Sequence, residues 1–155
     1  MHKHEVELPL KKDFSGKLRR LKAIPMNQEQ MVHCKEEIKD LLQKDLIRKI
    51  KSPIACFAFY VNKHVEIARG KPRLVVNYKL LNNILDYDAY PLPKPSTILT
   101  QISKSKIFSK FDLKSGFWQV GIKESDKWKT TFSVLEGHFE WNIMPFGLIN
   151  APSDF

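Results

Sequence analysis

The chain has 155 residues, of which 43% are hydrophobic, and this is enough to bury the core of one domain. Its 26 Lys and Arg residues outnumber its 17 Asp and Glu residues, and the formal net charge of +9 favours a polyanionic partner, of which nucleic acid is the commonest. A soluble basic domain without such a partner is the alternative. The sequence has no apolar run long enough for a membrane span or a signal peptide, so we expect an intracellular protein.

Residues 1–23 mix charged and apolar positions and predict an extended lead-in, with the basic residues of 17–22 in a solvated tail. Helical structure is expected next, because Asn27 and Gln30 have the spacing of a helix cap. Apolar residues then recur at helical spacing and predict an amphipathic helix that packs on another element: Met31, Cys34, Ile38, Leu41 and Leu42.

The two cysteines, Cys34 and Cys56, lack metal-ligand spacing with any histidine and lie among apolar residues. Buried, reduced thiols are therefore predicted.

Two hairpins are expected from runs of β-favouring residues. The first joins residues 54–61 and 74–78 through a basic, mobile tip, and the second joins residues 130–135 and 139–143 around Glu136-Gly137. The basic residues at the tip of the first hairpin are Lys63, Arg69, Lys71 and Arg73.

Between the hairpins, the alternate prolines of residues 90–95 exclude a helix and predict a stiff extended spacer, with an SH3-type ligand as the alternative. Ser96 is expected to cap a short helix that carries Ile98, Leu99 and Ile102.

A strand ending at Asp112 is predicted next. Ile107, Phe111 and Leu113 share one face of this strand, which aims Asp112 away from the core. A carboxylate on such an edge can hold Mg²⁺, although an aspartate in this setting is more often a cap or a turn residue. The aromatic Phe117 follows closely.

The end of the chain predicts a turn at residues 144–148 and an N-cap at Asn150. The chain stops at Phe155, barely one turn into the expected helix, so we expect it to be a fragment.

Four segments, in this order, resemble reverse transcriptases of retroelements, with the nearest similarity to caulimovirus-like pararetroviruses and Ty3/gypsy retrotransposons. The resemblance runs from about residue 24 to the end, and its motifs are KPRLVVNYKLLN at 71–82, YPLP at 90–93, FDLKSGFWQ at 111–119 and MPFGLINAPSDF at 144–155. It implies an α+β fold in which an antiparallel sheet with packed helices forms part of a right-hand polymerase. Residues 24–105 would be the fingers, and residues 106–155 the first part of the palm.

The resemblance also implies roles for single residues. Asp112 matches the first catalytic aspartate, which bridges two Mg²⁺ ions, and the backbone carbonyl of Leu113 would lie beside the second ion. Phe117 matches the aromatic residue under the incoming sugar, where its ring would exclude a 2′-hydroxyl. We therefore expect Asp112 to lie near Phe117 and near the residues that hold the triphosphate.

Further positions match the nucleotide pocket. Arg73 and Lys63 match fingers residues that grip the triphosphate, Phe146 and Gly147 match the loop that lines the pocket, and Gly116 allows a close backbone approach. Without the resemblance, Arg73 would read as a surface charge and Phe117 as a core residue.

The family carries two further aspartates in a Tyr-x-Asp-Asp hairpin, and these 155 residues contain no such tetrapeptide. The chain alone is therefore predicted not to polymerise, since one aspartate cannot hold two ions in reactive geometry. Ile149, where relatives usually have a basic residue, and the unusual residues 67–69 suggest drift in a decayed copy.

The partners implied by the resemblance are an RNA or DNA template-primer, dNTPs, and the remaining palm, thumb and RNase H domains of a parent polyprotein. Two alternatives remain open at this point. One is a non-catalytic, basic nucleic-acid-binding module, and the other is an inert packing domain.

Overall fold

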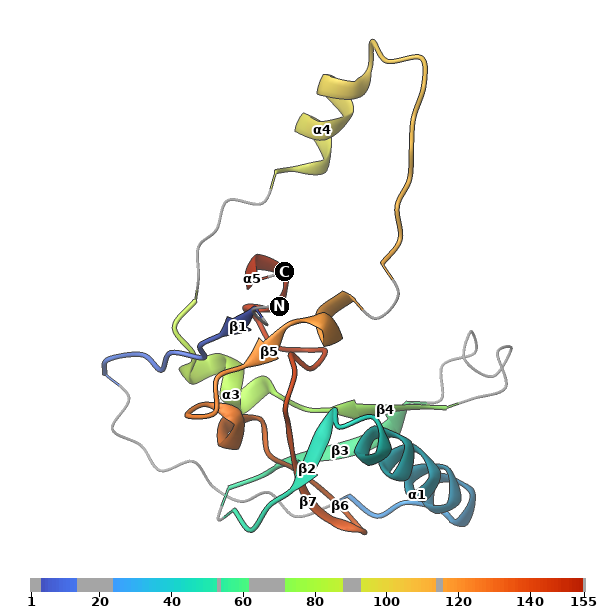
Figure 1. The fold of residues 1–155 in the computed structure, drawn as a ribbon, viewed down its shortest axis with the longest axis vertical. Helices are drawn as coiled ribbons and strands as arrows, with labels where there is room; N and C mark the ends of the chain where they lie inside the picture. Colours follow the sequence, from blue (N-terminus) through green and yellow to red (C-terminus); the bar gives the residue numbers. More distant parts are fainter. Residues whose placement is uncertain are drawn as a thin grey trace.

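The protein is described by a computed structural model, which places residues 4–13, 24–52, 54–61, 72–87, 93–113 and 116–154. Its centre is a five-stranded sheet in the order β2-β7-β6-β3-β4 (Figure 1). The strands are β2 (Ile47–Lys49), β3 (Cys56–Val61), β4 (Arg73–Val76), β6 (Phe132–Val134) and β7 (Gly137–Trp141).

Both predicted hairpins are present. Strands β3 and β4 pair antiparallel, and β6 and β7 do so with Val134 opposite Gly137. Gly137 has φ +133°, a backbone conformation that residues with a side chain rarely adopt, which explains glycine at this turn. The tip of the first hairpin, with Lys63, lies outside the described residues.

The two hairpins join through β3 and β6, which run parallel with Cys56 opposite Phe132. The sheet is therefore mixed, whereas we expected an antiparallel one. The reason is topological: each hairpin is antiparallel within itself, but the pairing between hairpins joins strands separated by a long connection, and such strands can run parallel. The combination of helices with this sheet agrees with the α+β class.

Helix α1 (Gln28–Gln43) confirms the expected amphipathic helix. The Asn27 side chain accepts a hydrogen bond from the Gln30 backbone N–H, and the Gln30 side chain accepts one from the Asn27 N–H, so the full capping box is formed. Helix α1 lies alongside the sheet (Figure 1) and buries Cys34, Ile38 and Leu41. Aromatic rings fill the core of the sheet, where Phe132 packs 5.9 Å from Phe139 and 5.8 Å from Trp141 between ring centroids.

The first residues are part of the fold, so the expectation of a solvated tail misses the segment 4–13. Strand β1 (Glu5–Val6) pairs in parallel with β5 (Gly121–Ile122), and Leu8 is fully buried. The basic residues of 17–22 lie outside the described residues.

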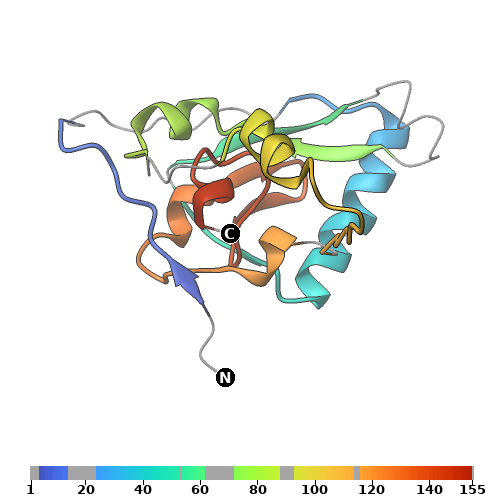
Figure 2. The ribbon, with the colours of Figure 1, turned by 90° about the horizontal axis from the view of Figure 1, so that it is seen from above.

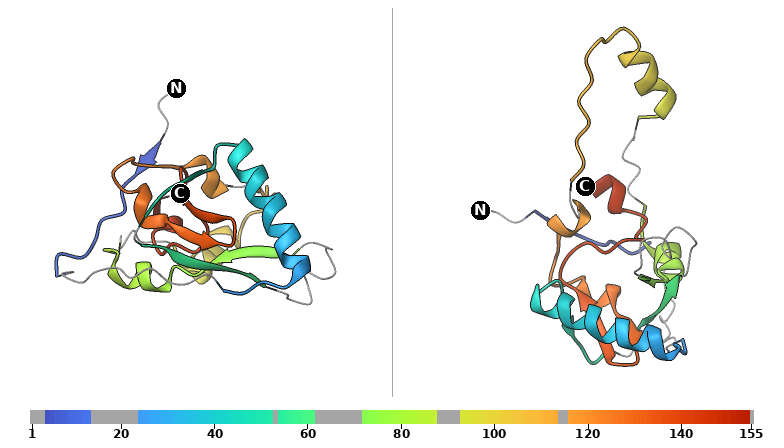
Figure 3. Two further views of the ribbon diagram at one scale, coloured as in Figure 1. Left: turned by 90° about the horizontal axis from the view of Figure 1, so that it is seen from below. Right: turned by 90° about the vertical axis from the view of Figure 1, so that its right-hand side faces the viewer.

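Helix α3 (Lys79–Ile84) follows β4, and helix α4 (Pro95–Ile102) stands away from the sheet (Figures 1 and 3). The short helix after the proline-rich segment is thus confirmed, but Ser96 is not its cap. The helix begins at Pro95, whose missing N–H is tolerated in a first turn, and Lys94 occupies the N-cap position. Of the expected spacer, residues 90–92 lie outside the described part of the chain.

The predicted strand before Asp112 is wrong. Residues 103–113 run as an irregular segment from α4 back towards the body (Figure 3), and no described strand pairs with them. Ile107 and Phe111 are both 88% exposed. Alternation of apolar residues gives a strand only where a second strand supplies hydrogen bonds and a surface to cover, and the described residues offer neither here.

Short 3-10 helices, η1 (Gly116–Gln119) and η2 (Lys127–Thr130), flank β5. The chain then turns through residues 144–150 into α5 (Ala151–Asp154), directly after Asn150 as predicted. Seen from above, α5 lies over the sheet (Figure 2). Among the described residues, no helix has both the length and the apolar character that a bilayer crossing requires.

Candidate nucleotide and nucleic-acid site

Two sequence motifs that lie far apart in the chain meet at a pair of aromatic rings. Phe117 lies in η1, and Phe146 lies in the turn that follows β7. Their ring centroids are 5.4 Å apart at an interplanar angle of 71°, an edge-to-face contact. Trp118 packs 6.1 Å from Phe146 and 6.2 Å from Trp141, which anchors the pair to the core of the sheet. Because Phe146 is 56% exposed, the cluster offers part of an aromatic surface to a ligand.

The backbone beside this surface is held by one amide side chain. Asn82 of α3 donates from Nδ2 to the Gly147 carbonyl oxygen at 2.8 Å, and its Oδ1 accepts from the Ile149 N–H at 3.0 Å. Gly147 has φ +95°, and a Cβ there would make only ordinary contacts, so backbone conformation rather than space requires glycine. We call residues 146–149 the nucleotide loop.

A cavity of about 430 Å³ opens beside the nucleotide loop and the end of β4. Its lining combines an ammonium group and three amides with aromatic walls, and these donors suit phosphates and base edges. The residues are Phe59, Val75, Val76, Asn77, Tyr78, Lys79, Asn82, Asn83 and Gly147. Sequence reasoning missed this cavity, although the repeated asparagines at 77, 82 and 83 were the available signal.

The predicted catalytic residue, Asp112, precedes η1 in the chain. Asp112 and Leu113 lie in the irregular segment after α4; both are exposed, Leu113 by 58%. Within the described ranges, no group of three or more His, Cys, Asp or Glu residues could hold a metal ion. One exposed carboxylate does not fit a two-ion magnesium centre, so these residues alone do not build one.

Some of the other predicted site residues lie together, and others lie apart from them or outside the described residues. Arg73 is exposed at the start of β4, opposite Val61, at the end of the hairpin that leads to the tip. Lys63 lies outside the described residues. Gly116 opens η1 directly before Phe117, so the structure brings Phe117, Phe146 and Gly147 close to one another, with Gly116 at their edge.

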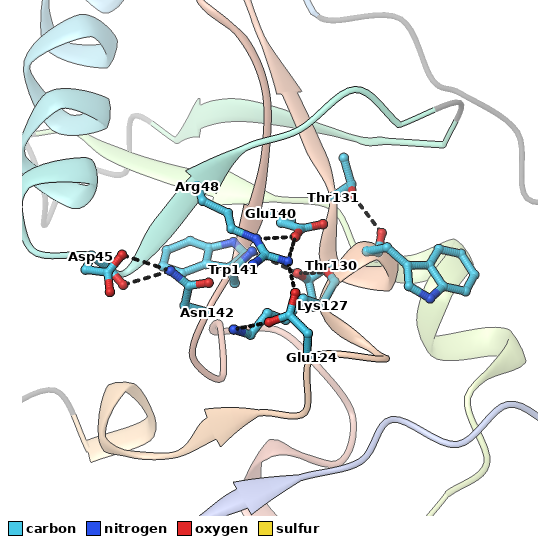
Figure 4. Close-up of polar contacts among 10 residues, drawn as sticks. Asp45, Arg48, Glu124, Lys127, Thr130, Thr131, Glu140, Trp141 and Asn142 are labelled. Carbon is cyan, nitrogen blue, oxygen red and sulfur yellow. Dashed lines mark hydrogen bonds and ion pairs between the residues drawn. The ribbon is translucent and has the colours of Figure 1, made fainter. Parts of the chain in front are cut away.

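A charged network links β2 and β7 to residues 124–127 (Figure 4). The Arg48 Nε donates to Glu140 Oε1 at 2.6 Å, and the guanidinium also pairs with Glu124, which accepts from Lys127 at 2.9 Å. Hydrogen bonds from Arg48 and then from Lys127 lower the pKa of Glu124 to about 2. The network ties β2 and β7 to the segment that carries η2.

Both cysteine thiols have raised pKa values. Burial, followed by the nearby Glu136 carboxylate, raises the pKa of Cys34 to about 12, and burial raises the pKa of Cys56 to about 11. Both thiols are free and buried, as the sequence predicts.

Comparison with known proteins identifies the family to which these motifs point. The family described as "Reverse transcriptase (RNA-dependent DNA polymerase)" matches residues 61–155. The genome polyprotein of Petunia vein clearing virus (isolate Shepherd) is 47% identical over 150 residues, which are 97% of this chain and 7% of the polyprotein. The enzymatic polyprotein of Cauliflower mosaic virus (strain Strasbourg) is 46% identical over 139 residues, covering 90% of this chain and 20% of the polyprotein.

Solved structures show the same fold. The protease-reverse transcriptase of prototype foamy virus (CSH mutant) has a TM-score of 0.78 and 24% sequence identity, over 96% of this chain and 20% of that one. A foamy viral protease-reverse transcriptase in complex with an RNA/DNA hybrid has a TM-score of 0.74 and 21% identity, again over 96% of this chain and 20% of that one. The chain thus spans only a fraction of the relatives it matches, 7% in one polyprotein and 20% in another.

Proposed function

This chain belongs to the reverse transcriptase (RNA-dependent DNA polymerase) family, and we propose that it contributes the fingers and the first part of the palm to an RNA-directed DNA polymerase. Residues 24–105 are the proposed fingers, and residues 106–155 the proposed start of the palm. The parent enzyme extends a primer 3′-hydroxyl with dNTPs.

The observation that carries the proposal is the contact between Phe117 and Phe146. These rings come from two motifs of the family and form one surface, with Gly116 and Gly147 at its edge. A flat aromatic surface is suited to the apolar face of a sugar and base, and glycine backbone lets a ligand approach closely. We assign this surface to the incoming nucleotide, with Phe117 beneath its sugar.

Charged groups complete the nucleotide site in the proposal. Arg73 and Lys63 hold the triphosphate through charge-assisted hydrogen bonds. Asp112 supplies a carboxylate, and Leu113 a backbone carbonyl, to magnesium ions whose other protein ligands come from outside these 155 residues. Bound Mg²⁺ would neutralise the triphosphate and activate the primer hydroxyl.

The cavity beside the nucleotide loop is proposed to hold a nucleic-acid strand. Lys79 and the amides of Asn77 and Asn83 present hydrogen-bond donors, and the net charge of +9 attracts phosphates. The foamy viral enzyme that shares this fold forms a complex with an RNA/DNA hybrid, which supports a template-primer as the partner.

The exposed apolar residues of the α4 segment are proposed to pack against the rest of the palm. Leu99 is 63% exposed, and Ile107 and Phe111 are more exposed still, which is unusual for a surface that remains in water. This chain covers only 7% and 20% of two polyproteins it matches, which leaves length for such a partner. The proposed parent also carries thumb and RNase H domains. The isolated chain is therefore proposed to be inactive.

The test uses a chimera in which these 155 residues are followed by the corresponding downstream segment of the Petunia vein clearing virus polyprotein, long enough to include the Tyr-x-Asp-Asp hairpin expected of the family. We expect this chimera to incorporate dNTPs with Mg²⁺, and Asp112→Asn to abolish incorporation while duplex binding is kept. The matched control is Asp40→Asn, which removes a carboxylate from an exposed position on α1. Full incorporation by the Asp112→Asn chimera would refute the role of Asp112.

A second function, favoured by the charge and by the donors of the cavity, is nucleic-acid binding without catalysis. Salt-dependent template binding by a chimera that incorporates no dNTP under any metal condition would support this function, or a decayed copy, over the polymerase.

A further inference from the structure

We infer that the first described segment, residues 4–13, positions the nucleotide loop, and that Asp126 and Lys129 are the positioning residues that hold this segment in place. We call it the N-terminal strap. The strap itself is observed, whereas its effect on nucleotide binding rests on the proposed function.

A buried ion pair holds the strap at Leu8 through hydrogen bonds to its backbone. The Leu8 N–H donates to Asp126 Oδ2 at 2.7 Å, and Lys129 Nζ donates to the Leu8 carbonyl oxygen at 2.6 Å. Lys129 and Asp126 also pair with each other at 2.7 Å, and their side chains are only 10% and 12% exposed. Both backbone polar groups of one residue are thus satisfied by two charges, while the Leu8 side chain is fully buried.

On the amino-terminal side of Leu8 the strap is bound to the β5 strand. Lys123 donates its backbone N–H to the Val6 carbonyl at 3.0 Å, and Gly121 donates to the His4 carbonyl at 2.9 Å. A Cβ on Gly121 would lie 3.1 Å from Glu5 Cγ, so a larger residue there would require the Glu5 side chain to shift.

On the other side of Leu8 the strap is bound to the end of α3 (Figure 1). Asp86 donates its N–H to the Pro9 carbonyl at 2.8 Å, and the Lys11 N–H donates to the Ile84 carbonyl at 2.9 Å. The strap therefore spans the space between β5 with η2 and the end of α3.

Helix α3 carries Asn82, whose amide holds both Gly147 and Ile149 of the nucleotide loop. The helix covers only Lys79–Ile84, and a helix this short has little stability of its own, so its neighbours fix its position. At its start, Tyr78 donates its hydroxyl to the Thr130 carbonyl of η2 at 2.9 Å. At its end, the strap supplies the second attachment. Lys129 binds Leu8, and three residues further along the strap Lys11 binds the Ile84 carbonyl of the helix that carries Asn82.

The structural part is tested by hydrogen exchange on the 155-residue chain. Lys129→Met should accelerate amide exchange about tenfold at Leu8 and also at Ile149, whose N–H is bound to Asn82. Lys123→Met is the matched control, since Lys123 pairs with Glu7 of the same strap at an exposed position. Accelerated exchange at Leu8 with unchanged exchange at Ile149 would overturn the coupling.

The unsubstituted chain gives a second measurement in case Lys129→Met fails to fold. In native-state exchange across a denaturant series, the amides of Leu8, Lys11 and Ile149 should open together with one denaturant dependence. Separate opening of Ile149 would contradict the inference.

The functional part is measured on the polymerase chimera. We expect Lys129→Met to raise KM for dNTP about three- to tenfold with little change in kcat, and Lys129→Arg to restore KM. Asn82→Ala should give the same effect, and the double variant should be no worse than either single one. A loss in kcat as large as the rise in KM would refute positioning, and so would a double variant whose rise in KM is the product of the two single rises. A chimera that has no activity, but whose Leu8 and Ile149 amides still exchange together, would refute the proposed function and leave the coupling intact.

Discussion

Arg48 and Glu140 lie directly opposite each other on β2 and β7, and their ion pair places a carboxylate with a 1% exposed side chain inside the sheet. Among the residues that the structure describes, the Glu140 Oε2 atom has no hydrogen-bond partner, and the cation paired with this carboxylate is Arg48. The pair holds an edge strand to the strand that leads into the nucleotide loop.

Removal of Arg48 should therefore be costly. Arg48→Met leaves the buried Glu140 charge unpaired, and we expect a loss of about 2 kcal/mol in the free energy of unfolding, less than for a fully buried pair because Arg48 is 42% exposed. Urea denaturation measures this loss. The control Glu124→Gln, which removes the exposed partner of Arg48, should cost much less, and Arg48→Met with Glu140→Leu should recover most of the loss. Equal urea midpoints for Arg48→Met and Glu124→Gln would contradict the conclusion that the Glu140 charge depends on Arg48.

The pH dependence of stability should carry the signature of Glu37 on α1. Burial raises the pKa of Glu37 above its ordinary 4.5, although the Tyr60 hydroxyl, which donates to Glu37 Oε2 at 2.8 Å, opposes the shift. The folded state then binds the proton more tightly than the unfolded state. This contribution to stability is complete below pH 4.5 and is lost as the pH rises through the folded pKa.

Thermal unfolding from about pH 4 to pH 7 tests this sign. Glu37→Gln mimics the protonated side chain, so its stability relative to the unsubstituted chain should increase as the pH rises. Glu36→Gln, an exposed neighbour on the same helix, is the control for loss of one negative charge. A stability difference for Glu37→Gln that stays constant with pH would remove Glu37 from the titration.

Sugar selection should depend on Phe117. In the polymerase chimera, Phe117→Val shortens the side chain proposed to lie under the sugar, and we expect the preference for dNTP over rNTP in kcat/KM to fall at least about tenfold. Phe57→Val removes a ring from β3 and serves as the control for general loss of aromatic packing. An unchanged preference in the Phe117→Val chimera would mean that another residue excludes the 2′-hydroxyl.

Nucleic-acid affinity should depend on Lys79 in the cavity. Lys79→Ala is expected to weaken template-primer binding and to lower the slope of log K against log salt by about 1, the value for one phosphate contact. Lys44→Ala removes the same charge from the end of α1, where Lys44 is paired with Asp40, and should leave the slope unchanged. Fluorescence anisotropy across a salt series distinguishes the two variants. Equal slopes in both would place the phosphate contacts elsewhere.

The amino-acid sequence alone determined the elements whose stability is local. Helix α1 follows from Asn27, Gln30 and the helical spacing of apolar residues, because capping and amphipathicity are properties of neighbours in the chain. The β6-β7 hairpin follows from alternation around Gly137 for the same reason. The four ordered motifs indicated the family, which the match over residues 61–155 confirmed.

Tertiary structure decided everything that depends on a partner distant in the sequence. The bond from Leu8 to Asp126 joins residues 118 positions apart, and no local pattern marks Leu8 as a core residue. The parallel pairing of β3 with β6 and the grip of Asn82 on the nucleotide loop are likewise set by packing. Residues 107–113 show the converse: their alternation is that of a strand, but hydrogen bonds and burial come from neighbouring strands, and none of the described strands lies beside them.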